Sequence, residues 1–239
     1  MAEKKDLVVK ETTEVAMARV NEQEDFFSEM GTEDFTVPFT RVLADMSSVV
    51  KEGTHAAGLI FNTGSGDAVS EMNAVLVKRP EKTITVRSDD GEFVASYPYT
   101  TEKLAECTAT QDGLKRWDAE GNSVYETWNY YIMDIDTEEI SICPMLSSNY
   151  SVAKAWNTRV RLQKKYSPSQ MVWKLSTKES GKGKKTFWMF ANPSFVGEVA
   201  PDKIEVVNFA KEMFQTAKVD HSKGFESETD DSTVESSDF

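Results

Sequence analysis

The sequence predicts a mainly β fold, a β-barrel with helical additions, and two observations lead to this prediction. Aromatic and β-branched residues gather in short runs that polar turns separate, which is typical of antiparallel hairpins. Two further stretches, 147–166 and 202–218, instead repeat their apolar residues at helical spacing. A chain of 239 residues is long enough to bury one core of roughly 150 to 190 residues between tails.

The strand pattern begins at residue 72. MNAVLVKR (72–79) and KTITVRS (82–88) flank a Pro-Glu break, so this stretch predicts either a pair of long strands or one bent strand with a bulge. Next, SVYETWNYYIMDID (123–136) and EISICPML (139–146) flank a short polar turn and predict a hairpin.

A helix and a second hairpin follow. In SSNYSVAKAWNTRVRLQKKY (147–166) the apolar residues fall at helical spacing, and a serine at its start is a suitable N-cap. QMVWKLSTK (170–178) and KTFWMFA (185–191) then flank ESGKGK (179–184), a cationic turn, which predicts the second hairpin. The C-terminal helix, 202–218, carries an apolar stripe.

The rest of the chain divides around these elements. Residues 35–67 mix short apolar runs with glycines and predict irregular packed structure, and a helix is predicted at 100–114. The predicted parts are an acidic flexible arm (1–34), a domain (35–218) with an insertion at about 89–122, and a disordered acidic C-terminal tail (219–239).

The order of the predicted elements is a long β element, a hairpin, a helix and a second hairpin. This order matches the OB-fold, a five-stranded Greek-key barrel with a helix between strands 3 and 4, to which a C-terminal helix is added here. OB-folds bind oligonucleotides, so the predicted fold directs attention to nucleic-acid binding.

The net charge of −13 at pH 7 is unevenly distributed along the chain. Residues 1–34 and residues 226–239 each carry a net −6, which leaves −1 for residues 35–225. Within this middle part, Lys154–Lys185 holds ten cations against the single acid Glu179, a net +9. Acidic ends therefore hide a locally basic segment, and the overall charge does not exclude a nucleic-acid ligand.

Single-stranded nucleic acid offers a protein a chain of phosphates and exposed base faces. Lys and Arg neutralise phosphates and release condensed counterions, and aromatic rings stack on bases with about 1–3 kcal/mol per base. The basic segment and the strand after it contain both kinds of side chain. The predicted DNA-binding residues are Lys154, Trp156, Arg159, Arg161, Lys164, Lys165, Tyr166, Trp173, Lys174, Lys178, Lys182, Lys184, Lys185 and Trp188.

Each of these residue types also has a simpler interpretation. Lysines on an exposed helix and hairpin occur for solubility alone, and an aromatic residue in a strand packs in the core more often than it stacks on a base. Trp128, Tyr130 and Ile132 alternate on one strand face, where core and binding roles are equally open. The same two alternatives hold for Trp173 and Trp188.

The sequence singles out no catalytic site, cofactor or metal ligand. SGKGKKTF (180–187) lacks the G-x-x-x-x-G-K-[ST] spacing of a P-loop and leads into a strand rather than a helix. Cys107 and Cys143 lie far apart without a His at ligand spacing, and neither of the two histidines has a nucleophile beside it. We therefore predict that the protein is no enzyme.

The chain ends in ESETDDSTVESSDF (226–239), in which six of fourteen side chains are acidic and none is basic. An OB-fold with an acidic tail that ends in an aromatic residue resembles single-stranded DNA-binding proteins of bacteria and tailed phages, among them phage proteins whose tails end in Asp-Phe. The resemblance implies that the tail recruits replisome proteins, such as a DNA polymerase or helicase, and competes with DNA for the cationic groove. The matching tail residues are Asp230, Asp231, Glu235, Asp238 and Phe239.

The leading hypothesis is therefore a sequence-independent single-stranded DNA-binding protein of phage replication, recombination and repair. No apolar run approaches the roughly 20 residues that cross a bilayer, so we expect no membrane partner and a place in the cytoplasm of a bacterial host. An acidic protein-interaction or DNA-mimic factor and an OB-type RNA-binding chaperone are the alternatives. The sequence leaves open whether the helix 202–218 packs on its own barrel or on a second copy in a homodimer.

Overall fold

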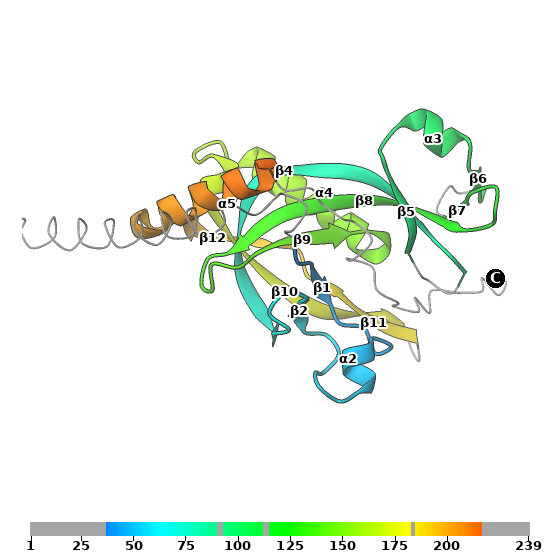
Figure 1. The fold of residues 1–239 in the computed structure, drawn as a ribbon, viewed down its shortest axis with the longest axis horizontal. Helices are drawn as coiled ribbons and strands as arrows, with labels where there is room; N and C mark the ends of the chain where they lie inside the picture. The colour runs from blue at the N-terminus through cyan, green and yellow to red at the C-terminus, as the bar shows by residue number, and fades with distance from the viewer. Residues whose placement is uncertain (1–36, 90–92, 112–114, 183–184, 217–239) are drawn as a thin grey trace, which may run out of the picture.

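The computed structural model describes residues 37–89, 93–111, 115–182 and 185–216 (Figure 1). The fold is mainly β, as the sequence predicts, and its strands form a small three-stranded sheet and a large antiparallel sheet. The small sheet contains β1 (Thr40–Val42), β2 (Ile60–Asn62) and β3 (Ala68–Val69). The strands of the large sheet are β4 (Glu71–Arg87), β5 (Phe93–Pro98), β6 (Thr108–Ala109), β7 (Arg116–Trp117), β8 (Ser123–Asp134), β9 (Ile140–Met145), β10 (Met171–Lys182), β11 (Lys185–Phe190) and β12 (Ser194–Glu198).

The long strand β4 is the centre of the large sheet. It is one strand rather than two, and its pairing with β8 shifts register between Leu76 and Lys78 and again between Lys78 and Glu81. Pro80 lies in this irregular stretch, where its missing N–H costs no regular ladder bond. The bent strand with a bulge is therefore the correct one of the two sequence-based alternatives.

Both predicted hairpins are present. β8 pairs with β9, and β10 pairs with β11, in each case antiparallel. The large sheet runs in the order β11-β10-β4-β8-β7-β6, with β5 and β12 pairing with β4 and β10. The helix α4 (Tyr150–Leu162) follows β9 and precedes β10, as the sequence predicts.

The strands of the described residues do not form a closed barrel, so the predicted five-stranded OB barrel is not confirmed. No ladder joins β9 to β11, and the first described residues of the chain lie between these two strands instead. The N–H of Ile142 in β9 donates to the carbonyl of Pro38 over 2.8 Å, and Phe39 forms a parallel bridge with Ile142. On the other side, the hydroxyl of Thr177 in β10 donates to the carbonyl of Gly58. A segment that precedes the predicted barrel in sequence thus occupies the place of the closing pair.

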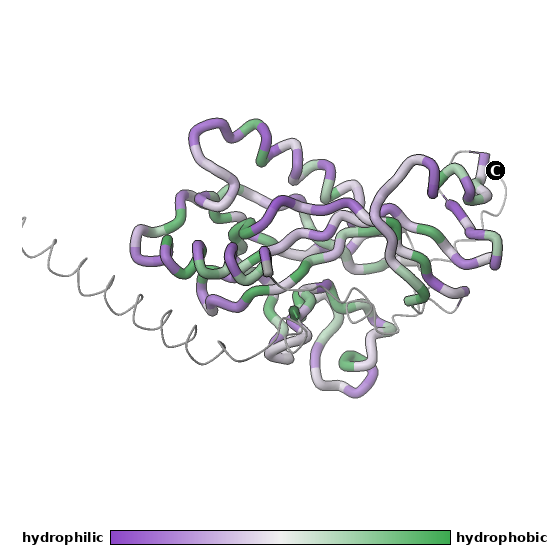
Figure 2. The backbone as a smooth tube through the Cα atoms, turned by 45° about the horizontal axis from the view of Figure 1, so that its top comes forward, coloured by the Kyte–Doolittle hydropathy of each residue, from purple (hydrophilic) through white to green (hydrophobic). Residues whose placement is uncertain are grey.

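The helices α4 and α5 (Ile204–Thr216) cover opposite faces of the sheet. Consecutive residues of β8 alternate between the two faces, so that Tyr130 and Ile132 join the core under α4 whereas Tyr131 and Met133 join the core under α5. Tyr130 and Ile132 are fully buried, which settles the core role for both. Hydrophobic stretches of the chain accordingly follow the central strands (Figure 2).

The apolar stripe predicted for the C-terminal helix is confirmed. Val207, Ala210 and Phe214 of α5 are buried, and the ring of Phe214 meets Tyr131 edge-on with 5.1 Å between centroids. The 3-10 turn η3 (Pro201–Lys203) leads into the helix. The helix packs on its own sheet, and the homodimer stays a prediction.

The region predicted as an insertion contains β5, β6, β7 and the helix α3 (Thr101–Ala105), and it packs on the far ends of β4 and β8 (Figure 1). The predicted helix 100–114 is too long. Thr100 caps α3 by accepting the N–H of Lys103 over 3.1 Å, but Thr108–Ala109 then pairs with β7 and ends any helix there. β-branched threonines favour this switch to a strand.

Three other features differ from the sequence-based expectation. Residues 35–67, expected to be irregular, contain β1, β2 and the short helix α2 (Ser48–Lys51). The strand β12 was not predicted and pairs with β10 across a register shift between Val172 and Trp173. The predicted arm 1–34 and tail 219–239 lie outside the described residues.

Candidate nucleic-acid interface

The helix α4 carries five of the predicted DNA-binding cations. It starts beside β11, because the side-chain oxygen of Asn149 accepts the N–H of Phe190 over 2.8 Å. It ends where the N–H of Gln163 turns back to the carbonyls of Arg159 and Val160. The five cations on or directly after α4 are all exposed, and none forms an ion pair with a described carboxylate; they are Lys154, Arg159, Arg161, Lys164 and Lys165.

The buried face of α4 determines where these cations point. Val152, Ala153 and Trp156 pack into the core, so Lys154 and Arg161, which are two turns apart, share the side of the helix that faces solvent. Arg159 lies at the flank, where its guanidinium donates to the carbonyl of Pro193 in the loop after β11. The guanidinium is thereby tied to a neutral acceptor and keeps its charge uncompensated.

Two of the predicted stacking residues are core residues, which corrects the prediction for both. Trp156 is 0% exposed and Trp173 is 1% exposed, so neither ring can meet a base. Trp156 stacks on Tyr130 with 4.4 Å between centroids and meets Trp173 edge-on at 6.3 Å. α4 and β10 each turn the apolar side that carries its Trp toward the shared interior.

The other two predicted stacking residues keep part of their surface. Tyr166 is half-buried and stacks on Phe195 of β12 with 6.0 Å between centroids. Trp188 is half-buried in β11 and lies directly against Gly58. Phe187, next to Trp188, is 43% exposed. These three rings are therefore aromatic surfaces near the basic segment that a base can still reach.

The predicted cations of the second hairpin fall into three groups. Lys174 pairs with Glu71 over 2.9 Å, so its charge is already compensated. Lys178 is exposed. The side chains of Lys182 and Lys185 at the tip, and Lys184 as a whole, lie outside the described part of the chain, as do the tail residues Asp230, Asp231, Glu235, Asp238 and Phe239.

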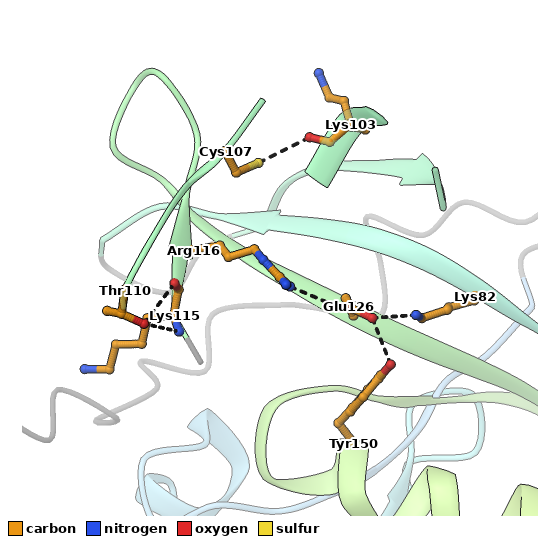
Figure 3. Close-up of polar contacts among 8 residues, drawn as sticks. All are labelled: Lys82, Lys103, Cys107, Thr110, Lys115, Arg116, Glu126 and Tyr150. Carbon is orange, nitrogen blue, oxygen red and sulfur yellow. Dashed lines mark hydrogen bonds and ion pairs between the residues drawn. The ribbon is translucent and has the colours of Figure 1, made fainter. Parts of the chain in front are cut away.

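A cluster that the sequence did not reveal surrounds Glu126 in β8 (Figure 3). Its carboxylate accepts from Arg116 of β7 over 2.9 Å and from the hydroxyl of Tyr150, the first residue of α4, over 2.8 Å. Lys82 of β4 forms an ion pair with the same carboxylate. One carboxylate thus connects the inserted region, the central strand and the start of α4.

The pKa values in this cluster follow from its contacts. Burial alone would raise the pKa of Glu126, but the hydrogen bonds from Lys82, Tyr150 and Arg116 outweigh it and lower that pKa below its ordinary value. Burial alone would lower the pKa of Lys82, but the hydrogen bonds with Glu126 and Tyr150 outweigh it and raise that pKa. Glu126 and Lys82 are therefore both charged throughout the physiological pH range.

Lys82 belongs to VKRPEKT (77–83), which holds three cations around the proline of the β4 bulge. Its ammonium lies 3.6 Å from the centroid of the Tyr99 ring and 5.7 Å from that of Tyr150. The concentration of basic residues beside a proline break is the sequence signal for this site. Its connection to α4 depends on the tertiary contact through Tyr150, which sequence spacing does not contain.

The described residues hold no group of three or more metal-ligating side chains. Cys143 is fully buried, and this burial raises the pKa of its thiol above the ordinary range, whereas Cys107 is half-buried. None of the helices in the described ranges is both long and apolar enough to cross a bilayer.

The chain is a mainly β protein with α4 and α5 on opposite faces of one antiparallel sheet. It belongs to the Pam3 phage gp34-like protein family, whose model matches residues 9–227. The match includes every described residue and ends just after the start of the acidic tail. No curated protein and no solved structure matches the sequence.

Proposed function

We propose that this protein binds single-stranded DNA without sequence preference and coats it during phage replication, recombination and repair in the host cytoplasm. The observation that carries the proposal is the exposure of all five cations on and after α4, in a protein whose net charge is −13. Repulsion from the acidic rest of the chain would weaken phosphate binding, so a bare cationic row on one helix is best explained by an anionic ligand.

A row of exposed cations suits a flexible phosphate chain. Each phosphate that Lys or Arg neutralises releases condensed counterions, and this release supplies most of the affinity when sequence is not read. Lys154 and Arg161 lie about 10 Å apart along the helix axis, which allows both to contact one strand. Tyr166, Phe187 and Trp188 are the rings that can add stacking.

The arrangement of strands supports an OB-like core within the large sheet. β4, β8, β9, β10 and β11 follow one another with α4 between the third and the fourth, as in the OB-fold. Of the strand pairs in an OB-fold, β4–β8, β8–β9, β10–β11 and β10–β4 are present here, and only the pair β9–β11, which would close the barrel, is missing among the described residues. Because OB barrels are themselves partly open, the missing closing pair is compatible with this proposal.

The resemblance of the acidic tail extends the proposal to partners. The tail, residues 226–239, would recruit a replisome protein such as a DNA polymerase or helicase through Phe239 and its neighbouring carboxylates. It would also compete with DNA for the cations of α4, because an acidic peptide carries negative charge, as a phosphate chain does.

Fluorescence titration with poly-dT at several salt concentrations tests the proposal. We expect log K to fall with log salt by about 0.7 for each phosphate engaged. The double variant Lys154→Glu, Arg161→Glu should reduce this slope by about 1.4, because two phosphate contacts are lost. Lys51→Glu is the matched control, since Lys51 is exposed on α2 and forms no ion pair with a described carboxylate.

Binding that does not respond to salt, or a preference for duplex DNA, would contradict the proposal. Equal competition by single-stranded RNA would favour the RNA-binding alternative instead. Absence of any quenching by poly-dT would favour the protein-interaction alternative.

A further inference from the structure

A trough lies where β4 changes its partner strand. β10 pairs with β4 only up to Val75, and β5 pairs with it only from Thr83 onward. Neither strand pairs with residues 76–82, which are bulged against β8. The trough has a volume of about 670 Å³, and its lining includes Lys78, Arg79, Lys82, Tyr97, Pro98 and Trp128.

The lining combines cations with accessible rings. Lys78 and Lys82 each pair with a glutamate, but Arg79 is exposed and makes no ion pair or hydrogen bond with a described residue. Tyr97 is 41% exposed and Trp128 is half-buried. A guanidinium without a carboxylate partner binds phosphate through its planar fork of donors, and the nearby rings offer faces for a base.

We propose that this trough is a nucleotide-binding subsite on the path of the unpaired strand. One or two nucleotides lie in it, with a base against Tyr97 or Trp128 and a phosphate on Arg79. A volume of about 670 Å³ is within the range of small-ligand sites and holds a nucleotide. The inference rests on the proposed function and adds a second contact region, outside the basic segment 154–185.

The trough and the row of cations on α4 meet at the ring of Tyr150. The ammonium of Lys82, which lines the trough, lies 5.7 Å from the centroid of Tyr150. The ammonium of Lys154, which begins the row on α4, lies 4.7 Å from the same centroid. A strand that leaves the trough therefore reaches Lys154 first and then Arg161 along the helix.

Two substitutions test the subsite in the full chain. Tyr97→Ala removes a ring and should weaken binding of a fluorescein-labelled dT oligonucleotide of about 16 residues by roughly 5- to 150-fold. Arg79→Glu should reduce the slope of log K against log salt by about 0.7 or more, since one phosphate contact is lost. Trp128→Phe should reduce the fractional quenching of tryptophan fluorescence by poly-dT, which reports contact at this position.

Matched controls separate the subsite from general effects. Val94→Ala changes a side chain of β5 that is 49% exposed and does not line the trough, and Lys51→Glu reverses an exposed charge on α2. Both controls should bind dT as the wild type does. Because Tyr97 and Arg79 are exposed, their variants should keep the wild-type melting temperature.

Three results would overturn the inference. If the wild type binds dT and both trough variants bind it equally well, the subsite is wrong while the proposed function stands. If dTMP competes as well per nucleotide as the oligonucleotide does, the trough binds a free nucleotide and is not part of a strand path. If the wild type does not bind dT, the proposed function fails and the subsite fails with it.

Discussion

Replacing the carboxylate of Glu126 with an amide should destabilise the fold measurably. Glu126 is the common acceptor for Lys82, Arg116 and Tyr150, which come from three different parts of the chain (Figure 3). In Glu126→Gln the side chain keeps its shape, but both ion pairs lose their anion. Two partly buried cations then face a neutral group.

The size of this effect follows from the exposure of the cluster. The side chain of Glu126 is 20% exposed, and those of Lys82 and Arg116 are 21% and 28% exposed. Hydrogen bonds to charged groups contribute about 1.5–3 kcal/mol each when shielded, and remaining solvent contact reduces this contribution. We expect a loss of about 2 kcal/mol in the free energy of unfolding. For a chain of this size such a loss lowers Tm by about 4–8 °C.

Thermal unfolding followed by circular dichroism measures this change. The matched control is Glu71→Gln, which removes the carboxylate of the exposed pair with Lys174, whose side chains are 54% and 42% exposed. An exposed pair contributes about 0–1 kcal/mol, so the control should melt close to the wild type. Equal losses in the two variants, or no loss in Glu126→Gln, would refute the reasoning.

The pH dependence gives an independent check. Folding lowers the pKa of Glu126, so the ionised carboxylate stabilises the folded protein. This contribution to the free energy of unfolding is fully present above the ordinary glutamate pKa of about 4.3, and it is lost as the pH falls through the lower pKa of the folded protein. Because the pKa of Lys82 is raised by folding, its contribution is present below about pH 10.4 and fades only above it. The stability gap between wild type and Glu126→Gln should therefore be constant from about pH 6 to 9 and shrink below about pH 4. A gap that widens in acid would contradict this.

Three further outcomes are expected. Gly58→Ala should destabilise the protein by more than about 1 kcal/mol, because Gly58 has a φ of +81° and an added Cβ would overlap Trp188. Gly53→Ala is the control for backbone strain alone, because Gly53 has a φ of +76° with open space around it. If the two variants melt at the same temperature, the predicted overlap with Trp188 is contradicted. Trp156→Ala should cost about 3–5 kcal/mol in urea unfolding, as expected for a fully buried ring, whereas a surface role predicts almost no change. Deleting residues 226–239 should tighten poly-dT binding and abolish co-purification of a polymerase or helicase, and weaker DNA binding would refute the competing tail.

The elements with the clearest local patterns were predictable. The hairpins β8–β9 and β10–β11 join strands rich in aromatic and β-branched residues across polar turns, and such turns bring adjacent strands together without help from distant residues. α4 and α5 each carry an apolar stripe at helical spacing. β12, by contrast, contains a glycine and depends on a register shift in its pairing with β10, so its sequence gives little sign of a strand.

The predicted site was only partly accessible to sequence reasoning. The exposed cations of α4 follow from helical spacing, because the apolar residues identify the buried side and the cations take the other. The burial of Trp156 and Trp173 was not predicted, because aromatic residues are common both in cores and on nucleic-acid-binding surfaces. For Trp156 the helical spacing that it shares with Val152 was the available signal of burial. The compensation of Lys174 by Glu71 joins residues more than one hundred positions apart, which no local pattern contains.

The sequence by itself determined the mainly β class, the two hairpins with a helix between them, and the concentration of positive charge between acidic ends. These properties depend on neighbours within a few turns or strands, where periodicity and turn chemistry act. Only the tertiary structure decided which rings are buried, that β1 contacts both β9 and β11, and that Lys82 and Lys154 meet at Tyr150. These outcomes depend on packing between distant segments, because burial and ion pairing are set by whatever the fold brings together.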